Sequence, residues 1–267
     1  TNDFTVPQST DDYLNTIPEP AAVSVRRKKE QLDIDPDLAK EIKLAYYATT
    51  SFMDAQIGRV LDKLKATGLD KNTIVVFTSD HGYHLGEHGH WQKQTLFEDA
   101  TRVPLIISGP GVMTTNEVVK APVELVDLYP TIMDIVDLQT LRFVSGKSLV
   151  PYFTNSKAAV RNSALTELQI NIGNRKAQGY GIQTNRYRFN QWSYKGGFSY
   201  ELYDHKFDEA ELENLADNTE YTSIKDSLRT VLESRITEAN RVPIGLGKQI
   251  NDAMPTFEPK RFFSKSK

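Results

Sequence analysis

The apolar positions between residues 38 and 64 recur every three or four residues, which is the spacing of one face of a helix. Asp35 offers an N-cap carboxylate, Pro36 suits the first helical position, and Gly68 offers a stop. The apolar members of the pattern are Leu38, Ile42, Ala45, Phe52, Ile57, Val60, Leu61 and Leu64. The pattern therefore predicts one long amphipathic helix that begins at Asp35-Pro36 and stops at Gly68.

Two continuous apolar runs follow this helix. The first, at 74–77, ends abruptly in Ser79-Asp80-His81-Gly82, and a loop rich in glycine and histidine comes after it. The second, at 103–107, is closed by a Gly-Pro-Gly turn. Buried parallel strands are continuous apolar runs that deliver polar groups to a site at their carboxyl ends. The order helix, strand, loop, strand therefore predicts an α/β fold.

The second half of the chain has the composition and alternation of strands. The strands expected there are 164–170, 180–184, 187–192 and 200–203. Asn185-Arg186 lies where a tight turn would join the middle pair, and apolar residues return to helical spacing from about 220 to 239. A polar stretch at about 154–163 is the best candidate for a boundary between two subdomains. We therefore expect an α/β part at 1–158 and a smaller α+β part with an antiparallel sheet at 159–267.

Three further segments carry simpler predictions. Residues 1–34 are polar and broken by prolines, which is typical of a surface excursion rather than a core element. Residues 123–126 have the composition of a short strand, and Pro130 suits the start of a helix that runs to about residue 136. The tail from Arg241 has scattered aromatics and a basic end, so we expect a wrapping extension.

Composition excludes several function classes. A net charge of −3 and a pI near 6.0 argue against a general nucleic-acid binder, because such a protein needs a strong positive field. The absence of cysteine excludes disulfides and thiolate metal sites. No apolar run approaches the roughly 20 residues that a membrane-spanning helix requires.

The candidate chemistry lies after the first apolar run. Asp80 and His81 are adjacent ligand-capable side chains at a strand end, which fits a metal site, a catalytic pair or a hydrogen-bonded strand terminus. A hard cation such as Ca²⁺ takes about six to eight ligands, mostly oxygen, so other residues would have to complete a metal site. Lys93, at the far end of the loop, can stabilise an oxyanion as a compact point charge.

Three histidines in the same loop leave a second possibility open. The spacing of His84 and His88 would align them on a helix, and with His90 they suggest zinc. Glycines interrupt this segment and disfavour a helix. We therefore favour histidines that line a pocket or hydrogen-bond to the loop backbone.

The run from Asn72 to Pro110 resembles the second signature of type I sulfatases, and most closely the iduronate-2-sulfatase branch of the alkaline phosphatase superfamily. The motifs that carry the resemblance are Thr-Ser-Asp-His-Gly at 78–82, Leu-Gly-Glu-His-Gly at 85–89, Trp-Gln-Lys at 91–93 and Arg-Val-Pro-Leu-Ile-Ile at 102–107. Supporting matches lie at 46–48, 54–59, 126–131 and 146–149. The similarity covers about residues 37–153 well and the C-terminal part more loosely.

The resemblance implies a fold, a cofactor and residue roles. The fold would be part of an alkaline-phosphatase-like sandwich, a mostly parallel sheet flanked by helices, followed by the smaller α+β subdomain. Asp80 and His81 would be two ligands of one Ca²⁺ ion, and Lys93 would contact the sulfate group. Tyr83 and His84 would border the sulfate and sugar pocket. A cation that polarises the sulfate, with a lysine that offsets developing charge, is consistent with this chemistry.

One departure from the family concerns the nucleophile. The family uses a formylglycine made from Cys or Ser in a Cys/Ser-x-Pro-x-Arg motif, and no such motif is present in the 267 residues. The paired aspartates that supply other calcium ligands are also missing. We therefore expect a C-terminal portion of a sulfatase whose N-terminal portion is a separate, tightly associated chain. A sheet split between chains exposes apolar edges, so we expect this chain to be unstable alone.

A second departure concerns substrate recognition. Where related enzymes carry a basic residue that reads a uronate carboxylate, this chain has Gln183, with Arg186 and Arg188 close by. Gln183 and Arg186 are therefore candidate substrate-binding residues, and this departure weakens the argument for iduronate as the substrate. The competing interpretation is a surface arginine in a hairpin. His205 is interpreted as structural.

Three functions remain open at this point. The leading one is hydrolysis of a sulfate ester on a sulfated sugar or polysaccharide, and the resemblance implies export to the periplasm, the lysosome or the cell exterior. A phosphoesterase or phosphonate hydrolase of the same superfamily is the alternative enzyme. A non-catalytic module that binds sulfated glycans is the alternative from a different class.

Overall fold

The computed structural model describes residues 11–112, 117–141 and 144–241, so the predicted wrapping tail lies outside the described residues. The α-helices are α1 Asp11–Leu14, α2 Glu19–Val25, α3 Pro36–Ala66, α4 Glu98–Thr101, α5 Leu128–Ile135 and α6 Thr222–Ala239. The strands are β1 Val75–Thr78, β2 Leu105–Ser108, β3 Ala164–Ile172, β4 Arg175–Gln183, β5 Tyr187–Tyr194 and β6 Gly197–Asp204. Short 3-10 turns are η1 Lys29–Gln31, η2 Leu69–Asn72, η3 Glu87–Gly89, η4 Leu125–Asp127, η5 Val150–Phe153 and η6 Thr219–Tyr221.

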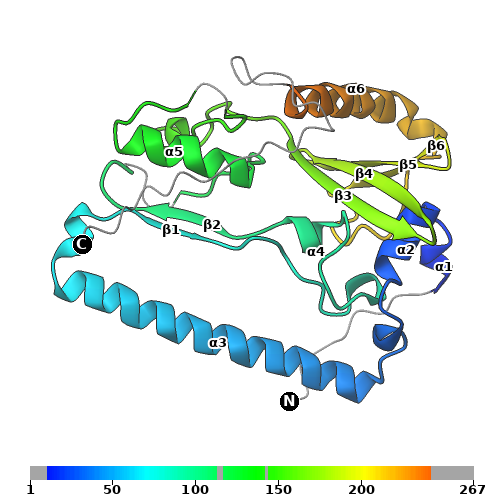
Figure 1. Cartoon of the computed structure of the whole chain (residues 1–267), viewed down its shortest axis with the longest axis horizontal. Helices are drawn as coiled ribbons and strands as arrows, with labels where there is room; N and C mark the ends of the chain where they lie inside the picture. The colour runs from blue at the N-terminus through cyan, green and yellow to red at the C-terminus, as the bar shows by residue number, and fades with distance from the viewer. Residues whose placement is uncertain (1–10, 113–116, 142–143, 242–267) are drawn as a thin grey trace, which may run out of the picture.

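Figure 1 shows how these elements are arranged. The long helix α3 runs along one side of the molecule, with the short β1–β2 pair between it and α5. The four-stranded sheet β3–β6 lies at the other end, with α6 on one face and α1 and α2 toward the other. None of the helices in the described ranges is long and apolar enough to cross a membrane.

Helix α3 begins and ends where its sequence predicts. The Asp35 carboxylate accepts hydrogen bonds from the backbone N–H groups of Asp37 and Leu38, at 3.0 and 3.2 Å, which caps the first turn. Gly68 adopts a left-handed conformation with φ 72° after the last turn. Only the beginning of the helix is anchored, because Ala39 is its one buried residue.

The pairing of β1 with β2 differs from the prediction. The two apolar runs do form strands, but they pair antiparallel, with Val75 opposite Ser108 and Thr78 opposite Leu105. The physical reason is the connection between the strands. The chain reverses in the loop that joins them, which contains the short turns η3 and α4 but no crossover helix. The strand β1 is also half-buried rather than buried. Within the described residues, the prediction that the first apolar run forms a buried parallel strand is therefore wrong.

The segment around residues 123–126 is not the strand expected there. It forms the turn η4, because Glu124 and Asp127 make reciprocal side-chain-to-backbone hydrogen bonds that favour a helical start. The following helix α5 matches the prediction to within two residues.

The four-stranded sheet is a simple antiparallel meander in the order β3-β4-β5-β6. A two-residue turn at Asn185-Arg186 joins β4 to β5 as predicted, closed by the Thr184 N–H donating to the Tyr187 carbonyl at 2.9 Å. Strand β4 begins five residues earlier than expected. Gly179 belongs to this earlier part, where an added Cβ would lie 2.6 Å from the ring of Trp192.

Both faces of this sheet are covered by apolar side chains. One cluster packs α6 on the sheet through Ile182, Phe189, Leu202, Leu228 and Leu232. The other cluster packs α1, α2 and the loop residues Leu96 and Phe97 on the opposite face. Alternation along the strands separates the two sets, as expected for a sheet that is buried on both sides.

The prediction that residues 1–34 form a surface excursion is wrong for the part described. Tyr13, Leu14, Ile17 and Ala21 are buried against the second sheet. The prediction treated the prolines as breaks in regular structure. Pro18 and Pro20 instead lie at the beginning of α2, where proline does not interrupt a helix. Helices α1 and α2 thus pack on the sheet formed by the second half of the chain. The division at residue 158 stays a prediction.

Candidate active site

The loop after β1 folds back tightly against α4. The Gly82 N–H donates to the Ala100 carbonyl at 2.9 Å, and an added Cβ at Gly82 would lie 2.0 Å from the Asp99 carbonyl oxygen. Only glycine allows this approach. The Ser79 hydroxyl donates to the His81 carbonyl at 2.9 Å, which fixes the turn that carries Asp80.

Asp80, His81 and Lys93 meet at the end of β1, and we call them the Asp-His-Lys cluster. Lys93 Nζ lies 2.5 Å from His81 Nε2, although twelve residues separate them in the chain. Asp80 Oδ2 lies 3.5 Å from the same His81 nitrogen. The Asp80 carboxylate is 84% exposed, so it is available to a ligand. The structure therefore brings together three of the predicted site residues.

The tautomer of His81 follows from its other nitrogen. Nδ1 lies 2.8 Å from the Gly82 carbonyl, which can only accept, so Nδ1 carries the proton. Nε2 consequently presents a lone pair toward Lys93 and Asp80. This arrangement orients the histidine for binding a cation.

Tyr83 lies at the surface beside the cluster. Its ring is 39% exposed and stacks on Tyr46 of α3, with the ring centroids 5.6 Å apart. This contact joins the loop to the long helix. A substrate contact by Tyr83 stays a prediction.

His84 does not lie at this surface, and its predicted place in the substrate pocket is corrected. Its side chain is 0% exposed, and its Nε2 lies 2.8 Å from the Thr95 hydroxyl. Burial, with smaller contributions from His90 and His88, lowers the pKa of His84 to about 2, so the ring is neutral. A substrate cannot reach it in this conformation.

The other two histidines of the loop are also interior groups. His90 Nδ1 lies 2.9 Å from the Val25 carbonyl of α2, as expected for a histidine that bonds to backbone. His88 stacks on Phe97 with ring centroids 3.9 Å apart, and burial lowers its pKa to about 4. Both rings help to pack the loop between α2 and the second sheet.

Gln183 and Arg186 are not brought to the Asp-His-Lys cluster by any contact in the described structure. Gln183 Nε2 donates to the Thr184 carbonyl at 2.8 Å and lies 3.2 Å from Nδ1 of His205. Arg186 holds the Asp204 carboxylate with two hydrogen bonds of 2.7 and 2.6 Å, and this contact lowers the pKa of Asp204. Both side chains therefore already have partners within the second sheet.

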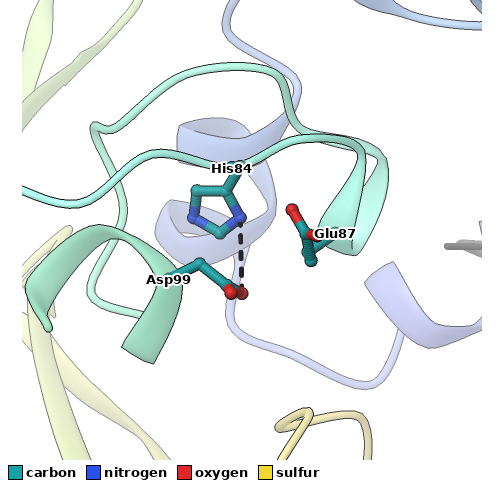
Figure 2. Close-up of side chains that lie close together, drawn as sticks. All are labelled: His84, Glu87 and Asp99. Atoms are coloured by element: carbon teal, nitrogen blue, oxygen red, sulfur yellow. Dashed lines mark ion pairs between the residues drawn. The ribbon is translucent and has the colours of Figure 1, made fainter. Parts of the chain in front are cut away.

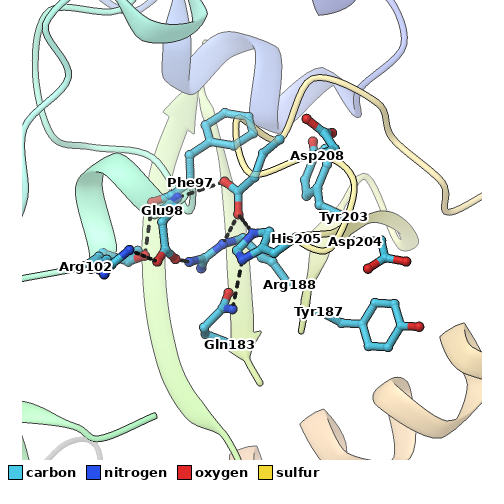
Figure 3. A network of polar contacts seen from close by, with 12 residues as sticks. Phe97, Glu98, Arg102, Gln183, Tyr187, Arg188, Tyr203, Asp204, His205 and Asp208 are labelled. Carbon is cyan, nitrogen blue, oxygen red and sulfur yellow. Dashed lines mark hydrogen bonds and ion pairs between the residues drawn. The ribbon is translucent and has the colours of Figure 1, made fainter. Parts of the chain in front are cut away.

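Arg188, the alternative reader of a substrate carboxylate, is an interior residue rather than a surface one. It is 1% exposed and forms ion pairs with Glu98 of α4 and with Glu211. It also donates to the Leu96 carbonyl at 3.0 Å. Figure 3 shows its guanidinium between Glu98 and His205. Arg188 is therefore fully engaged within the protein.

This network was missed from the sequence, although a signal was present. Alternation along β5 puts Arg188 on the same side as Asn190 and Trp192, and a charged residue at such an inward position requires a partner. Burial alone would raise the pKa of Glu211, but Arg188 and a hydrogen bond from His205 hold it below its usual value. The network joins α4, next to the candidate site, to the second sheet.

Residues that could hold a metal fall into separate places. In the described ranges, two groups of three side chains have metal-ligand geometry: His84, Glu87 and Asp99, and Glu98, His205 and Glu211. Asp80 and His81 belong to neither group. The exposed carboxylate of Asp80 and the Nε2 lone pair of His81 suit a cation, but they supply two ligands where Ca²⁺ takes about six to eight.

Comparisons with known proteins identify the family. The Sulfatase family model matches residues 6–138, and the model described as N-sulphoglucosamine sulphohydrolase, C-terminal, matches residues 86–238. A sulfatase from Formosa agariphila is 34% identical over 85% of this chain and 43% of its own length. Arylsulfatase K from Bos taurus is 32% identical over 74% of this chain and 37% of its own length. The chain belongs to the sulfatase family and spans less than half the length of these relatives.

Solved structures confirm the α/β, alkaline-phosphatase-like class of the fold. A 2-O GAG sulfatase superposes with a TM-score of 0.77 at 25% identity, covering 90% of this chain and 54% of that chain. A phosphonate monoester hydrolase from Silicibacter pomeroyi superposes with a TM-score of 0.76 at 27% identity, covering 88% and 51%. The family prediction is thus confirmed, whereas the iduronate-2-sulfatase branch stays a prediction.

Proposed function

We propose that this chain is the C-terminal portion of a sulfatase that removes sulfate from a sulfated sugar or polysaccharide. The observation that carries the proposal is the Asp-His-Lys cluster, in which a lysine ammonium, an imidazole lone pair and an exposed carboxylate converge at the end of β1. The family membership of the chain supports sulfate esters as the substrate class.

In this proposal Asp80 and His81 bind one Ca²⁺ ion through the carboxylate and through Nε2. The bound ion would polarise the sulfate group. Lys93 places a compact positive charge beside the same position and offsets the charge that develops on the departing oxygen. Tyr83 borders the substrate at the exposed edge of the loop. Gln183 and Arg186 are left out of this role, because their contacts lie within the second sheet.

The nucleophile and the remaining calcium ligands are supplied by polypeptide outside these 267 residues, within the same protein or on a partner chain. Two observations support a large missing contact. The helix α3 exposes Leu38, Leu44, Phe52, Met53, Val60 and Leu61, and the elements β2, η4 and α5 expose Ile106, Leu125, Val126, Tyr129 and Ile132. A two-stranded sheet such as β1–β2 is also marginal by itself. We propose that the N-terminal portion of the sulfatase, which carries the formylglycine, covers these surfaces.

A comparison of leaving groups tests the activity. The complete protein is assayed with a matched pair of aryl esters, one sulfate and one phosphate, and the released anions are measured separately. We expect sulfate release to predominate. Release of phosphate alone would overturn the proposal. Mass spectrometry of the same preparation should find formylglycine, or its Cys or Ser precursor, and its absence would favour a non-catalytic glycan-binding role.

The second candidate is a phosphonate monoester hydrolase, favoured by the superposition on the Silicibacter pomeroyi enzyme. An aryl phosphonate monoester in the same assay distinguishes it from a sulfatase. Export to the periplasm, the lysosome or the cell exterior is part of the sulfatase proposal, since it follows from the family.

A further inference from the structure

A second polar cluster lies beneath the loop, separate from the Asp-His-Lys cluster. His84 from the loop, Glu87 from η3 and Asp99 from α4 each offer one ligand atom, and these atoms lie within 4.8 Å of one another. Figure 2 shows the three side chains pointing toward a common space. His84 Nδ1 lies 3.7 Å from Asp99 Oδ2. Three elements of the chain therefore converge on one point.

The nitrogen of His84 that faces this space has no hydrogen-bond partner among the described residues. His84 is 0% exposed, and within the described ranges its Nδ1 makes no hydrogen bond, whereas Nε2 is bonded to Thr95. The separation of 3.7 Å from Asp99 is too long for a hydrogen bond. A neutral ring cannot form an ion pair either. A buried polar atom without a partner destabilises the folded state, so this nitrogen points to a ligand.

The charges around the same space are unbalanced. In the part of the chain that the structure describes, the ion-pair contacts of Asp99 are with His84 and with His88 Nε2, at 3.7 and 4.0 Å. Burial keeps both imidazoles neutral. Glu87 accepts a hydrogen bond from the Leu85 backbone N–H. Among the described residues, however, no lysine or arginine forms an ion pair with Glu87 or Asp99 beside the imidazole lone pair of His84.

We propose that His84, Glu87 and Asp99 bind a divalent transition-metal ion, with zinc as the best match, in a structural site that fastens the loop to α4. Imidazole nitrogen and carboxylate oxygen are ligands that zinc accepts at about 2.0–2.2 Å, which sets neighbouring ligand atoms about 3.4 Å apart in a tetrahedron. The 3.7 Å separation of His84 and Asp99 is close to that value. The buried imidazole favours zinc over Ca²⁺, which prefers oxygen.

Two neighbouring residues suit supporting roles. Thr95 bonds to His84 Nε2 and so fixes the ring with Nδ1 directed at the site, as outer partners of metal-bound histidines do. His88 lies next to Asp99 and is the candidate fourth ligand. A metal ion at this site would explain how a loop of this length keeps one conformation without regular structure. The proposal of a metal site does not rest on the proposed sulfatase activity.

The other three-residue group serves as an internal control. Glu98, His205 and Glu211 also have metal-ligand geometry, but Arg188 already lies between the two carboxylates. His205 Nε2 is hydrogen-bonded to Glu211 at 2.7 Å. This group therefore has its own cation and should bind no metal.

Metal content and location test the site. The complete protein is purified without chelators, zinc is measured by elemental analysis, and anomalous scattering at the zinc edge locates the ion and separates it from calcium. We expect one zinc ion per chain at His84 Nδ1. The variant Asp99→Asn should lower its occupancy at least about tenfold, whereas the control His205→Gln should leave it unchanged.

A stability measurement gives a second readout. After removal of metal, one equivalent of zinc should raise the thermal midpoint of the wild-type protein and not that of Asp99→Asn, because only the folded site binds the ion. If Asp99→Asn fails to fold, Glu87→Gln supplies the same comparison at the second carboxylate ligand. The proposal is overturned if the wild-type protein has no zinc at this position after incubation with zinc, or if the folded ligand variant keeps wild-type occupancy.

Discussion

At the residue scale, the Asp-His-Lys cluster shows how one short loop assembles different kinds of charge. Its three members come from positions 80, 81 and 93, and glycine at position 82 lets the loop pack directly on α4. The position of Lys93 depends on the whole loop, because twelve residues separate it from the histidine that it contacts. The lysine is therefore the most informative residue to change.

Replacement of Lys93 by alanine in the complete protein should reduce turnover of a sulfate ester by about 10²–10³-fold, because one charge-stabilising contact in the transition state is lost. The folded state should be unaffected, since Lys93 is exposed. Steady-state kinetics and circular dichroism measure the two effects. Lys176→Ala, at an exposed lysine of β4, is the matched control and should keep wild-type turnover. Near-normal turnover of Lys93→Ala would remove Lys93 from the site.

The structure brings some of the predicted site residues together and places others elsewhere, for a physical reason. Asp80, His81 and Lys93 are recognisable because the strand end and the motif fix their positions. His84 carries an equally strong motif, yet it turns inward to Thr95, and no pattern in a loop without regular structure reports which way a side chain points. The sequence left Arg188 open between a substrate contact and a surface position, and its interior position is not apparent because its two acidic partners lie far from it in the sequence.

A buried carboxyl group in the second sheet predicts a pH dependence. Burial raises the pKa of Glu201 from 4.5 to about 7, although Trp192 and Tyr203 donate hydrogen bonds to it. The folded state therefore binds a proton that the unfolded state releases between these two values. Stability from this group is complete below pH 4.5 and declines as the pH rises to about 7. The effect is on the order of 3 kcal/mol at most.

The variant Glu201→Gln should isolate this contribution, because the amide does not ionise. Relative to wild type, the thermal midpoint of the variant should rise as the pH increases from 5 to 8. Differential scanning calorimetry of the complete protein measures the difference at each pH. Glu233→Gln, on the exposed side of α6, is the control and should show no such trend. A constant difference across the range would mean that Glu201 is ionised throughout.

At the element scale, the short helix α4 connects the candidate site to the second sheet. Its residue Asp99 faces the loop, and its residue Glu98 pairs with Arg188 of β5. The Glu98 backbone N–H also donates to the Glu211 carboxylate at 2.8 Å. The position of α4 thus depends on its contacts with Arg188 and Glu211, which do not belong to the Asp-His-Lys cluster.

Replacement of Arg188 by methionine should destabilise the complete protein by about 3–5 kcal/mol, because the buried carboxylate of Glu211 and the half-buried carboxylate of Glu98 lose their cation. Denaturant unfolding measures the loss. The control Arg229→Met removes an arginine from the surface of α6 and should change stability by less than about 0.5 kcal/mol. A similar small change for Arg188→Met would show that Glu98 and Glu211 find other partners or become protonated.

Most elements were predictable from the sequence, and the exceptions follow a pattern. Helix α3, helix α6 and the hairpin at Asn185-Arg186 are specified by local signals, namely caps, periodicity and turn residues. The antiparallel direction of β2 is decided by the path of the intervening loop, which local patterns do not report. The burial of α2 is decided by a sheet formed more than 130 residues later.

At the scale of the whole molecule, the exposed apolar side chains divide into two classes. Those on α3, β2 and α5 face the region that we assign to the missing portion of the sulfatase, whereas Phe198 lies on the β5–β6 hairpin of the second sheet. The first class should be buried in the complete enzyme. The second should remain exposed.

Substitution within the two classes tests this assignment. Phe52→Asp, at a side chain that is 68% exposed, should prevent assembly with the N-terminal portion and abolish activity, since a charge would be buried in an apolar contact. Phe198→Asp, at a side chain that is 63% exposed, is the matched control and should assemble normally. Coexpression of the two portions as separate chains, followed by size-exclusion chromatography, measures assembly. Normal assembly of Phe52→Asp would place the contact elsewhere.

The packing of α1 on the second sheet has a consequence for how the chain folds. The Tyr13 hydroxyl donates to the Glu211 carbonyl across 198 residues, so this contact has a very large sequence separation. Closing such a loop costs conformational entropy before any contact compensates it, and a high contact order slows folding. During synthesis, α1 and α2 must wait for β3–β6 to leave the ribosome. Although α1 and α2 are made before this sheet, they should therefore be among the last of the described elements to become protected from hydrogen exchange.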